Sequence, residues 1–402
     1  MRLLNTETLR MEEFFDSHVP LYAILSHTWE HEEILFHDMS KVREAKKNYG
    51  FEKLQGACKL AKSQGYKWIW IDTCCIDKSS SAELTEAINS MFRYYQDAGI
   101  CYAYLGDVKY SRDGDLEASV RKSRWFTRGW TLQELLAPAK LEFYSAGWQK
   151  IGHKAEPNLA ELVSRITGID MHTLMGGNIM DVCIPRRMHW ASTRQTTRVE
   201  DRAYSLLGIF KVNMPMIYGE GKKAFRRLQE EILKSSDDQS IFAWHNYEYS
   251  EGSAIDALAT SPSDFVSSGS LSREPFPRIG RKPTTITSQG IAIELPIMSV
   301  TRLDMMEFQP FEEIEAILDC QFGNVPGTFP TIRLRSLRQT TKDGPKHYYR
   351  VMSGAQMTTF EYFNRYAFVS DVPVIGLDPT RLHIDAYKET LGKARLRIYL
   401  DT

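Results

Sequence analysis

Cysteine is scarce in this chain and does not occur in paired motifs. The 402 residues include six cysteines, and none of them forms a CxxC pair or a Cys/His spacing suited to zinc. They are Cys58, Cys74, Cys75, Cys101, Cys183 and Cys320. We therefore expect reduced thiols in a cytoplasmic protein, with no disulfide framework and no metal site.

Long apolar runs and an excess of either charge are also missing. No segment approaches the roughly 18 apolar residues of a membrane span, and residues 1–16 lack the apolar core of a signal peptide. The 50 Lys and Arg residues nearly balance 51 Asp and Glu residues, which predicts no non-specific binding to nucleic acid. No GxxxxGK[ST] motif is present and no GxGxxG follows the first expected strand, so nothing favours ATP hydrolysis.

The first part of the chain alternates between short apolar runs and amphipathic segments. The expected strands are Leu21–Leu25, Lys67–Asp72, Ile100–Leu105 and Leu141–Tyr144, and the expected helices are Phe51–Gln64 and Ala82–Asp97. Strands that alternate with helices through short connections predict an α/β fold with a flavodoxin-like parallel sheet. Ligands bind beyond the carboxyl ends of such strands, so the polar residues there are the first candidates for a site.

The pattern changes twice further along the chain. Residues 151–245 contain three helical segments, at 158–167, 201–210 and 220–234, and these predict a helical extension of the α/β core at 1–150. Beyond a Ser-, Gly- and Pro-rich stretch at 261–283, alternating runs predict a β-rich C-terminal domain at 246–402. Its expected strands are Thr284–Leu295, Ile314–Phe322, Thr331–Leu337, Tyr348–Met352 and Ala394–Leu400.

Four segments in a fixed order carry a family resemblance. They are Tyr22–Glu30 (YAILSHTWE), Trp70–Lys78 (WIDTCCIDK), Arg128–Pro138 (RGWTLQELLAP) and Asp201–Phe210 (DRAYSLLGIF). With this order and spacing the chain resembles the HET domain, the heterokaryon-incompatibility module of filamentous fungi. The resemblance implies a role in fungal self/non-self recognition and regulated cell death. It covers residues 20–150 most fully and extends to Trp244.

The HET domain in turn resembles the TIR domain, more remotely. The stretch from Ser123 to Glu134 (SRWFTRGWTLQE) is similar to the Ser-x-Trp-Cys-x-x-Glu-Leu stretch of TIR domains, with Trp130 as the better match to their tryptophan. Its spacing to Glu134 is four residues, against three in that pattern. The glutamate is catalytic in TIR domains that cleave NAD⁺. The resemblance therefore implies a TIR-like fold and an NAD⁺ glycohydrolase, with NAD⁺ as substrate and no tightly bound cofactor.

The expected reaction asks for one carboxylate, and Glu134 is the candidate. Loss of neutral nicotinamide needs no general acid, but the oxocarbenium-like ribose needs a negative charge and hydrogen bonds. An alternative stays open, because Thr131-x-x-Glu134 is also the spacing of a helix capping box. In that reading Glu134 only satisfies a helix N-terminus.

Six further residues complete the predicted site, and each has a structural alternative. Trp29 and Trp130 are candidates to stack on a base or to fill the core. Ser26 and His27 are expected to meet a ligand or to make structural hydrogen bonds. Asp72 is a candidate to bind a ribose hydroxyl or to cap the following turn. Arg128 is a candidate to contact a phosphate or to form a salt bridge.

Two other functions compete with the glycohydrolase. A non-enzymatic signalling module would trigger death through contacts between HET domains or with another signalling protein. A Cys–His hydrolase would use Cys74 or Cys75 with His27 as base, which requires an activated thiolate. Self-association is expected to complete the site of the glycohydrolase, as it does in TIR domains.

Overall fold

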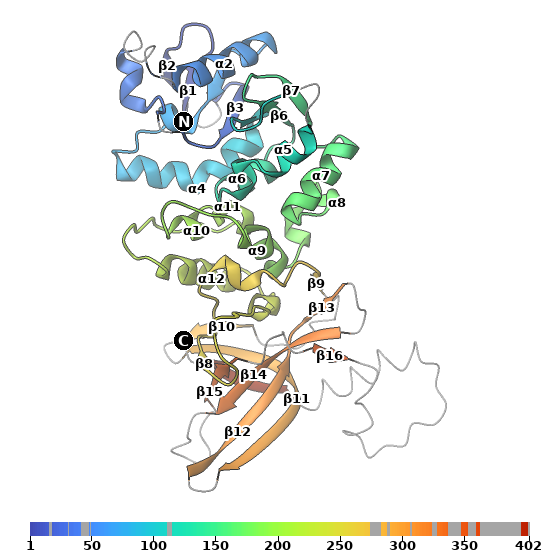
Figure 1. Cartoon of the computed structure of the whole chain (residues 1–402). Coiled ribbons are helices and arrows are strands. Elements are labelled where there is room, and N and C mark those ends of the chain that lie inside the picture. Colours follow the sequence, from blue (N-terminus) through green and yellow to red (C-terminus); the bar gives the residue numbers. More distant parts are fainter. Residues whose placement is uncertain are drawn as a thin grey trace. The chain divides into compact units, whose positions relative to one another are not determined.

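A computed structural model describes most of the chain and divides it into two compact units (Figure 1). The described residues are 1–15, 18–30, 32–41, 48, 50–110, 115–273, 283–287, 290–305, 308–323, 328–336, 347–352, 359–361 and 395–400. Unit 1 comprises Met1–Ile179 with Thr193–Ala224, and unit 2 comprises Met180–Ser192 with Phe225–Thr402. The finer division into domains at 1–150, 151–245 and 246–402 stays a prediction.

The sheet of unit 1 has a parallel centre and antiparallel edges. Its described strands lie in the order β2-β1-β4-β3-β5-β6-β7. They are β1 (Arg2–Asn5), β2 (Met11–Glu13), β3 (Tyr22–His27), β4 (Trp68–Trp70), β5 (Ile100–Leu105), β6 (Leu141–Ser145) and β7 (Lys150–His153). The predicted parallel sheet is confirmed for β4, β3, β5 and β6 and wrong for the edges. Short connections join β1 to β2 and β6 to β7, and such connections only allow antiparallel pairs.

The central strands place a switch point between β3 and β5. Numbered in chain order, the parallel strands are arranged 2-1-3-4, so that the chain leaves β3 toward one side of the sheet and β5 toward the other. The loops beyond the carboxyl ends of these two strands therefore diverge. In doubly wound sheets, ligands bind in the crevice at such a point.

β3 is longer than its apolar residues alone predict. All six of its residues are buried, and the strand continues through Ser26 and His27, which pair with Ala103 and Tyr104 of β5. The strand expected at Leu21–Leu25 therefore ends two residues later than predicted. Both polar side chains find buried hydrogen-bond partners, and this allows them to remain in a central strand.

Helices surround this sheet at nearly the predicted places. They are α2 (Gly50–Ser63), α3 (Asp72–Cys75), α4 (Ser81–Asp97), α5 (Leu116–Arg121), α6 (Thr131–Leu136), α7 (Pro157–Thr167), α8 (Met171–Leu174), α10 (Asp201–Tyr204) and α11 (Leu207–Phe210), with 3-10 turns η2 (Phe36–Lys41) and η3 (Arg124–Thr127). A further turn, η4 (Ile179–Asp181), begins at the last residue of this segment of unit 1 and continues into unit 2. Ser80 and Glu83 have the spacing of a capping box, and the Ser80 side chain caps α4 by accepting a hydrogen bond from the Glu83 amide. The Glu83 carboxylate instead forms a bidentate pair with Arg2 of β1 at 2.6 and 2.7 Å. The pair ties β1 to α4.

Unit 2 combines a few helices with β-structure. Its helical segments are α9 (Ile184–Ser192), most of α12 (Lys223–Ser235), η5 (Gln239–Phe242) and η6 (Pro262–Phe265). Its strands are β8 (Ala254–Ile255), β9 (Leu271–Arg273), β10 (Thr285–Thr287), β11 (Gly290–Met305), β12 (Phe308–Ile317), β13 (Cys320–Phe322), β14 (Thr328–Ser336), β15 (His347–Val351), β16 (Thr359–Glu361) and β17 (Arg395–Leu400). These strands agree with the β-structure predicted for this region. In β14, Ile332 and Leu334 are buried, whereas Arg335 points away from them and binds Glu313. This agrees with the alternation predicted for the strand. Leu337 lies outside the described residues.

Candidate functional site

Two clusters of polar side chains flank the carboxyl end of β3. Successive side chains of a strand point to opposite faces of the sheet, and Ser26 and His27 occupy successive positions. Ser26 reaches Glu134 of α6, while His27 reaches Asp72, the first residue of α3. The sequence-predicted residues are thus brought together as two groups.

The first cluster holds the Glu134 carboxyl below the protein surface. Ser26 Oγ donates to Glu134 Oε2 at 2.5 Å and accepts from Trp125 Nε1 at 2.8 Å. The hydroxyl of Tyr95, which donates to the Leu25 carbonyl, also lies within hydrogen-bonding reach of the carboxyl. Glu134 is only 7% exposed.

Burial changes the protonation of Glu134. Loss of hydration raises the pKa of this carboxyl to about 8, and the negative charge of Asp72 adds to the rise. Hydrogen bonds from Ser26 and Tyr95, together with the charge of Arg128, oppose the rise without cancelling it. The carboxyl is therefore largely protonated at pH 7 and titrates near physiological pH.

The capping alternative for Glu134 is wrong. α6 begins at Thr131, its N-cap position is Trp130, and no side chain caps the helix. Thr131 Oγ1 instead donates to the carbonyls of Trp125 and Arg128, and accepts from Arg194 at 2.9 Å. Since Thr131 is already inside the helix, Glu134 lies one position too far along to complete a capping box.

The second cluster surrounds Asp72. Its carboxylate is 3.0 Å from His27 Nε2, accepts from Trp29 Nε1 at 3.0 Å and is 3.4 Å from Lys78 Nζ. Burial favours the neutral acid, but Lys78 and the hydrogen bonds from His27 and Trp29 outweigh it and hold the pKa of Asp72 well below its usual value. Asp72 therefore starts α3 as an ionised acceptor for three side chains.

Trp29 is the exposed member of this second cluster. Its side chain is 42% exposed, and the ammonium of Lys78 lies 3.5 Å from the ring centroid. The core alternative for Trp29 is therefore wrong. An exposed indole held by Asp72 and Lys78 leaves part of the ring at the surface.

Arg128 and Trp130 make contacts that the sequence did not indicate. Arg128 Nη1 donates to Thr197 Oγ1 at 3.3 Å, and the Trp130 side chain is hydrogen-bonded to Asp201. Trp130 is half-buried, and Trp125, rather than Trp130, is the tryptophan that approaches Glu134 through Ser26. Trp125 lies in the same SRWFTRGW stretch, where its spacing alone did not distinguish it.

The adjacent thiols show no activation. Cys74 Sγ donates to the Ile71 carbonyl and Cys75 Sγ accepts from the Ile71 amide, and both side chains are buried. The contact with Cys75 and the loss of hydration raise the pKa of Cys74 well above its usual value. A thiol held in this way is a poor nucleophile, which argues against the Cys–His hydrolase.

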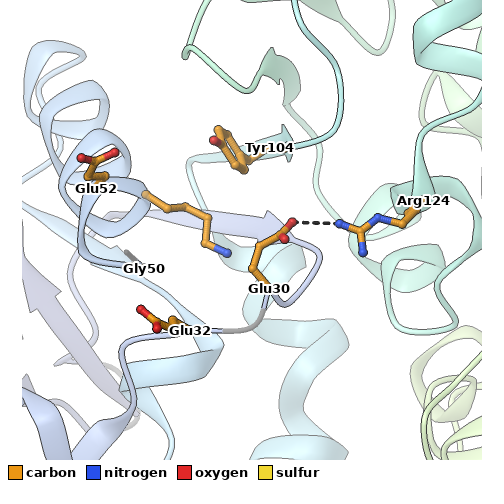
Figure 2. A pocket seen from close by; sticks show the side chains of 8 residues that line it. Glu30, Glu32, Gly50, Glu52, Tyr104 and Arg124 are labelled. Carbon is orange, nitrogen blue, oxygen red and sulfur yellow. Dashed lines mark hydrogen bonds and ion pairs between the residues drawn. The ribbon is translucent and has the colours of Figure 1, made fainter. Parts of the chain in front are cut away.

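A pocket of about 490 Å³ lies at the switch point (Figure 2). It is lined by Glu30, Glu32, Gly50, Glu52, Lys53, Tyr104, Gly106 and Arg124. Glu30 follows β3, Tyr104 and Gly106 lie at the end of β5, and Gly50 begins α2. None of the seven predicted site residues is in this lining, although Arg124 is next to Trp125 in the chain.

Comparison with known proteins identifies the first part of the chain. Residues 22–118 match the sequence profile of the family described as "Heterokaryon incompatibility protein (HET)". The chain is also 49% identical over 224 residues to "Vegetative incompatibility protein HET-E-1" of Podospora anserina.

Residues 22–118 thus match the HET family.

The similarity has defined limits along the chain. The alignment with the Podospora protein includes 54% of the chain and 16% of that relative's length. Residues 223–261 match a second profile, described as "Domain of unknown function (DUF8212)". No solved structure matches the chain significantly. No helix in the described part of the chain has the length and apolar character that crossing a membrane requires.

The HET profile covers only part of the candidate site. Ser26, His27, Trp29 and Asp72 lie within residues 22–118, whereas Glu134 lies beyond them. The fold nevertheless joins the two parts, because Ser26 holds Glu134 directly.

Proposed function

We propose that this protein acts in heterokaryon incompatibility and leads to regulated cell death when it is activated. The match of residues 22–118 and the identity with a vegetative incompatibility protein support this role. The chain corresponds to 16% of that relative, so the relative's further activities are not carried over.

For its chemistry, we propose an NAD⁺ glycohydrolase on a TIR-like domain, with Glu134 as the catalytic carboxylate. One observation carries this proposal. Glu134 lies buried beside the carboxyl end of β3, is held by Ser26 and does not cap its helix. Burying a carboxyl is unfavourable, and this one has no capping role to offset that cost, which favours a function in chemistry.

The proposed reaction breaks the bond between nicotinamide and ribose. The bonding electron pair leaves with the pyridinium nitrogen and gives neutral nicotinamide. Water then adds to the oxocarbenium-like ribose and loses one proton. A carboxylate next to the ribose stabilises the positive charge that develops on it, which is the role proposed for Glu134.

The cationic substrate helps to prepare this carboxylate. The pKa of Glu134 is about 8 in the free protein, so the carboxyl is mostly neutral at pH 7. A pyridinium cation nearby favours the ionised form and lowers that pKa. The remaining predicted residues, His27, Trp29, Asp72, Arg128 and Trp130, are proposed to form the surroundings in which NAD⁺ is held.

A second function, the non-enzymatic signalling module, is favoured by the closed state of Glu134. The carboxyl is buried and held by Ser26, which Trp125 holds in turn, and Glu134 does not line the described pocket. In this reading the HET surface binds another copy or another signalling protein. Glu134 then contributes only to the interior of the domain.

Nicotinamide release from NAD⁺ distinguishes the two. Purified protein is incubated with NAD⁺ over a series of protein concentrations, beside Glu134→Gln and, as a matched control, Glu117→Gln at an exposed ion pair of α5. The glycohydrolase predicts release that rises more steeply than protein concentration, none from Glu134→Gln and unchanged release from the control. No release at the highest concentration would favour the signalling module, and full activity in a dilute monomer would contradict the part played by self-association.

A further inference from the structure

The pocket at the switch point has a charge pattern of its own. Its lining holds three carboxylates, from Glu30, Glu32 and Glu52, against two cationic side chains, from Lys53 and Arg124. Figure 2 shows the carboxylate of Glu30 and the guanidinium of Arg124 pointing toward each other, at 2.9 Å. Counted over the lining residues alone, the carboxylates outnumber the cations by one.

Both cations of the lining are engaged by acidic groups. Lys53 Nζ is 2.5 Å from Glu33 Oε1, and both of these side chains are at least nine-tenths buried. Arg124 is held by Glu30 and lies 3.7 Å from Asp107. Among the residues that the structure describes, Glu52 has no ion-pair partner. The positive charges of the lining are therefore neutralised, while carboxylate charge remains.

Tyr104 supplies an aromatic wall within this negative field. Its ring stacks on Trp148 with centroids 4.6 Å apart, and its hydroxyl donates to the Ala146 carbonyl at 2.8 Å, so the ring is fixed. Burial, and then the charges of Glu30 and Glu52, raise the pKa of the Tyr104 hydroxyl. A β-carbon built on Gly106 would lie 3.1 Å from Tyr104 Cε1 and 3.5 Å from Glu30 Oε1, so this ring and this carboxylate border the same space.

We propose that this pocket binds a planar organic cation of the size of a pyridinium ring. A flat cation gains from the negative face of an aromatic ring and from carboxylates beside it, whereas a neutral ring of the same shape gains only ordinary stacking. Gly106, which lies beside Tyr104, brings no side chain into this space. The inference goes beyond the proposed function, since Glu134 does not line this pocket, and only the choice of a pyridinium as the cation rests on that function. It makes the charge of the ring the recognised feature.

The test compares two nearly identical probes that differ in charge. 1-Methylnicotinamide is a pyridinium cation, and nicotinamide is its neutral counterpart. Binding of each to the full chain is measured by NMR titration, without turnover. We expect the cation to bind about tenfold more tightly than the neutral ring. Glu52→Gln should reduce this preference at least about threefold, whereas Glu12→Gln, an exposed carboxylate on β2, should leave it unchanged.

Tyr104→Leu provides a second variant, and it should weaken binding of the cation more than binding of nicotinamide. Equal affinities of the two probes, no measurable binding of either, or a preference that survives both pocket variants would overturn the proposal. Nicotinamide release from NAD⁺ is measured on the same preparation. A charge preference without nicotinamide release would support the cation pocket and contradict the glycohydrolase. Nicotinamide release without a charge preference would support the glycohydrolase and contradict the cation pocket.

Discussion

Ser26 and Glu134, 108 positions apart in the chain, share a hydrogen bond of 2.5 Å between a central strand and a short helix. The hydroxyl is itself fixed by Trp125, so a buried indole, a buried hydroxyl and a buried carboxyl form one chain of hydrogen bonds. In a low-dielectric interior such a chain is costly to leave incomplete.

Replacing Glu134 by Gln should change how stability depends on pH. The folded pKa is about 8, above the usual 4.5, so the carboxyl stabilises the fold fully below about pH 4.5 and loses that contribution as the pH rises toward 8. We expect the free energy of unfolding of Glu134→Gln to rise relative to that of wild type by up to about 1.4 kcal/mol per pH unit in this window. Above the window the difference between the two should stay constant. Urea unfolding from pH 5 to 9 measures the difference, and parallel curves would contradict the assignment.

Ser26→Ala should destabilise the domain and raise the pKa of Glu134 further. The change removes the donor to the carboxyl and leaves the Trp125 N–H without its acceptor. Leaving buried groups unpaired costs about 1–3 kcal/mol in unfolding free energy. Ser63→Ala, which removes an exposed hydroxyl at the end of α2, is the control and should change stability by less than about 0.5 kcal/mol. Equal effects of the two substitutions in denaturant unfolding would show that the buried hydroxyl carries no special role.

Asp72→Asn should weaken the fold at neutral pH and lose this effect in acid. The pKa of Asp72 is held below its usual value of 3.8, so the ionised group stabilises the fold above that value and its contribution disappears as the pH falls toward the folded pKa. We expect a loss of about 1–3 kcal/mol at pH 7 and a smaller difference below about pH 4. Lys78→Met, which removes only the half-exposed ion pair and the contact with Trp29, should cost about 1 kcal/mol or less. A difference that is independent of pH would count against an ionised Asp72.

Gly208→Ala should destabilise unit 1 because α11 lies against α4. A β-carbon at Gly208 would fall 2.1 Å from Phe92 Cβ, and the two helices pack at this point. Overpacking of this kind costs about 1–3 kcal/mol. Gly147→Ala meets only the flexible end of Gln149 and serves as the control. Thermal unfolding compares the two, and similar melting temperatures would contradict the close approach of these helices.

Local patterns were sufficient for the elements of unit 1. The apolar run at Ile100–Leu105 became β5 with the predicted bounds, and the stripe at Ala82–Asp97 became α4. Such patterns act over a few residues, and burial of one face decides them. The strand β1 was missed, because its four residues are held by pairing with β2 and β4 and by the Arg2–Glu83 ion pair. The contacts with β4 and with Glu83 are long-range.

By itself, the sequence determined the HET resemblance, the parallel centre of the sheet and the choice of Ser26, His27, Asp72 and Glu134 as residues of interest. Only the tertiary structure decided their relationships: Ser26 with Glu134, and His27 with Asp72, on opposite sides of β3. The structure also shows that Glu134 is a buried carboxyl that does not cap α6, and that the pocket is lined by residues outside the predicted site. The physical reason is that hydrogen bonds, burial and the resulting pKa depend on distances between segments that are far apart in the chain, and residue spacing does not specify those distances.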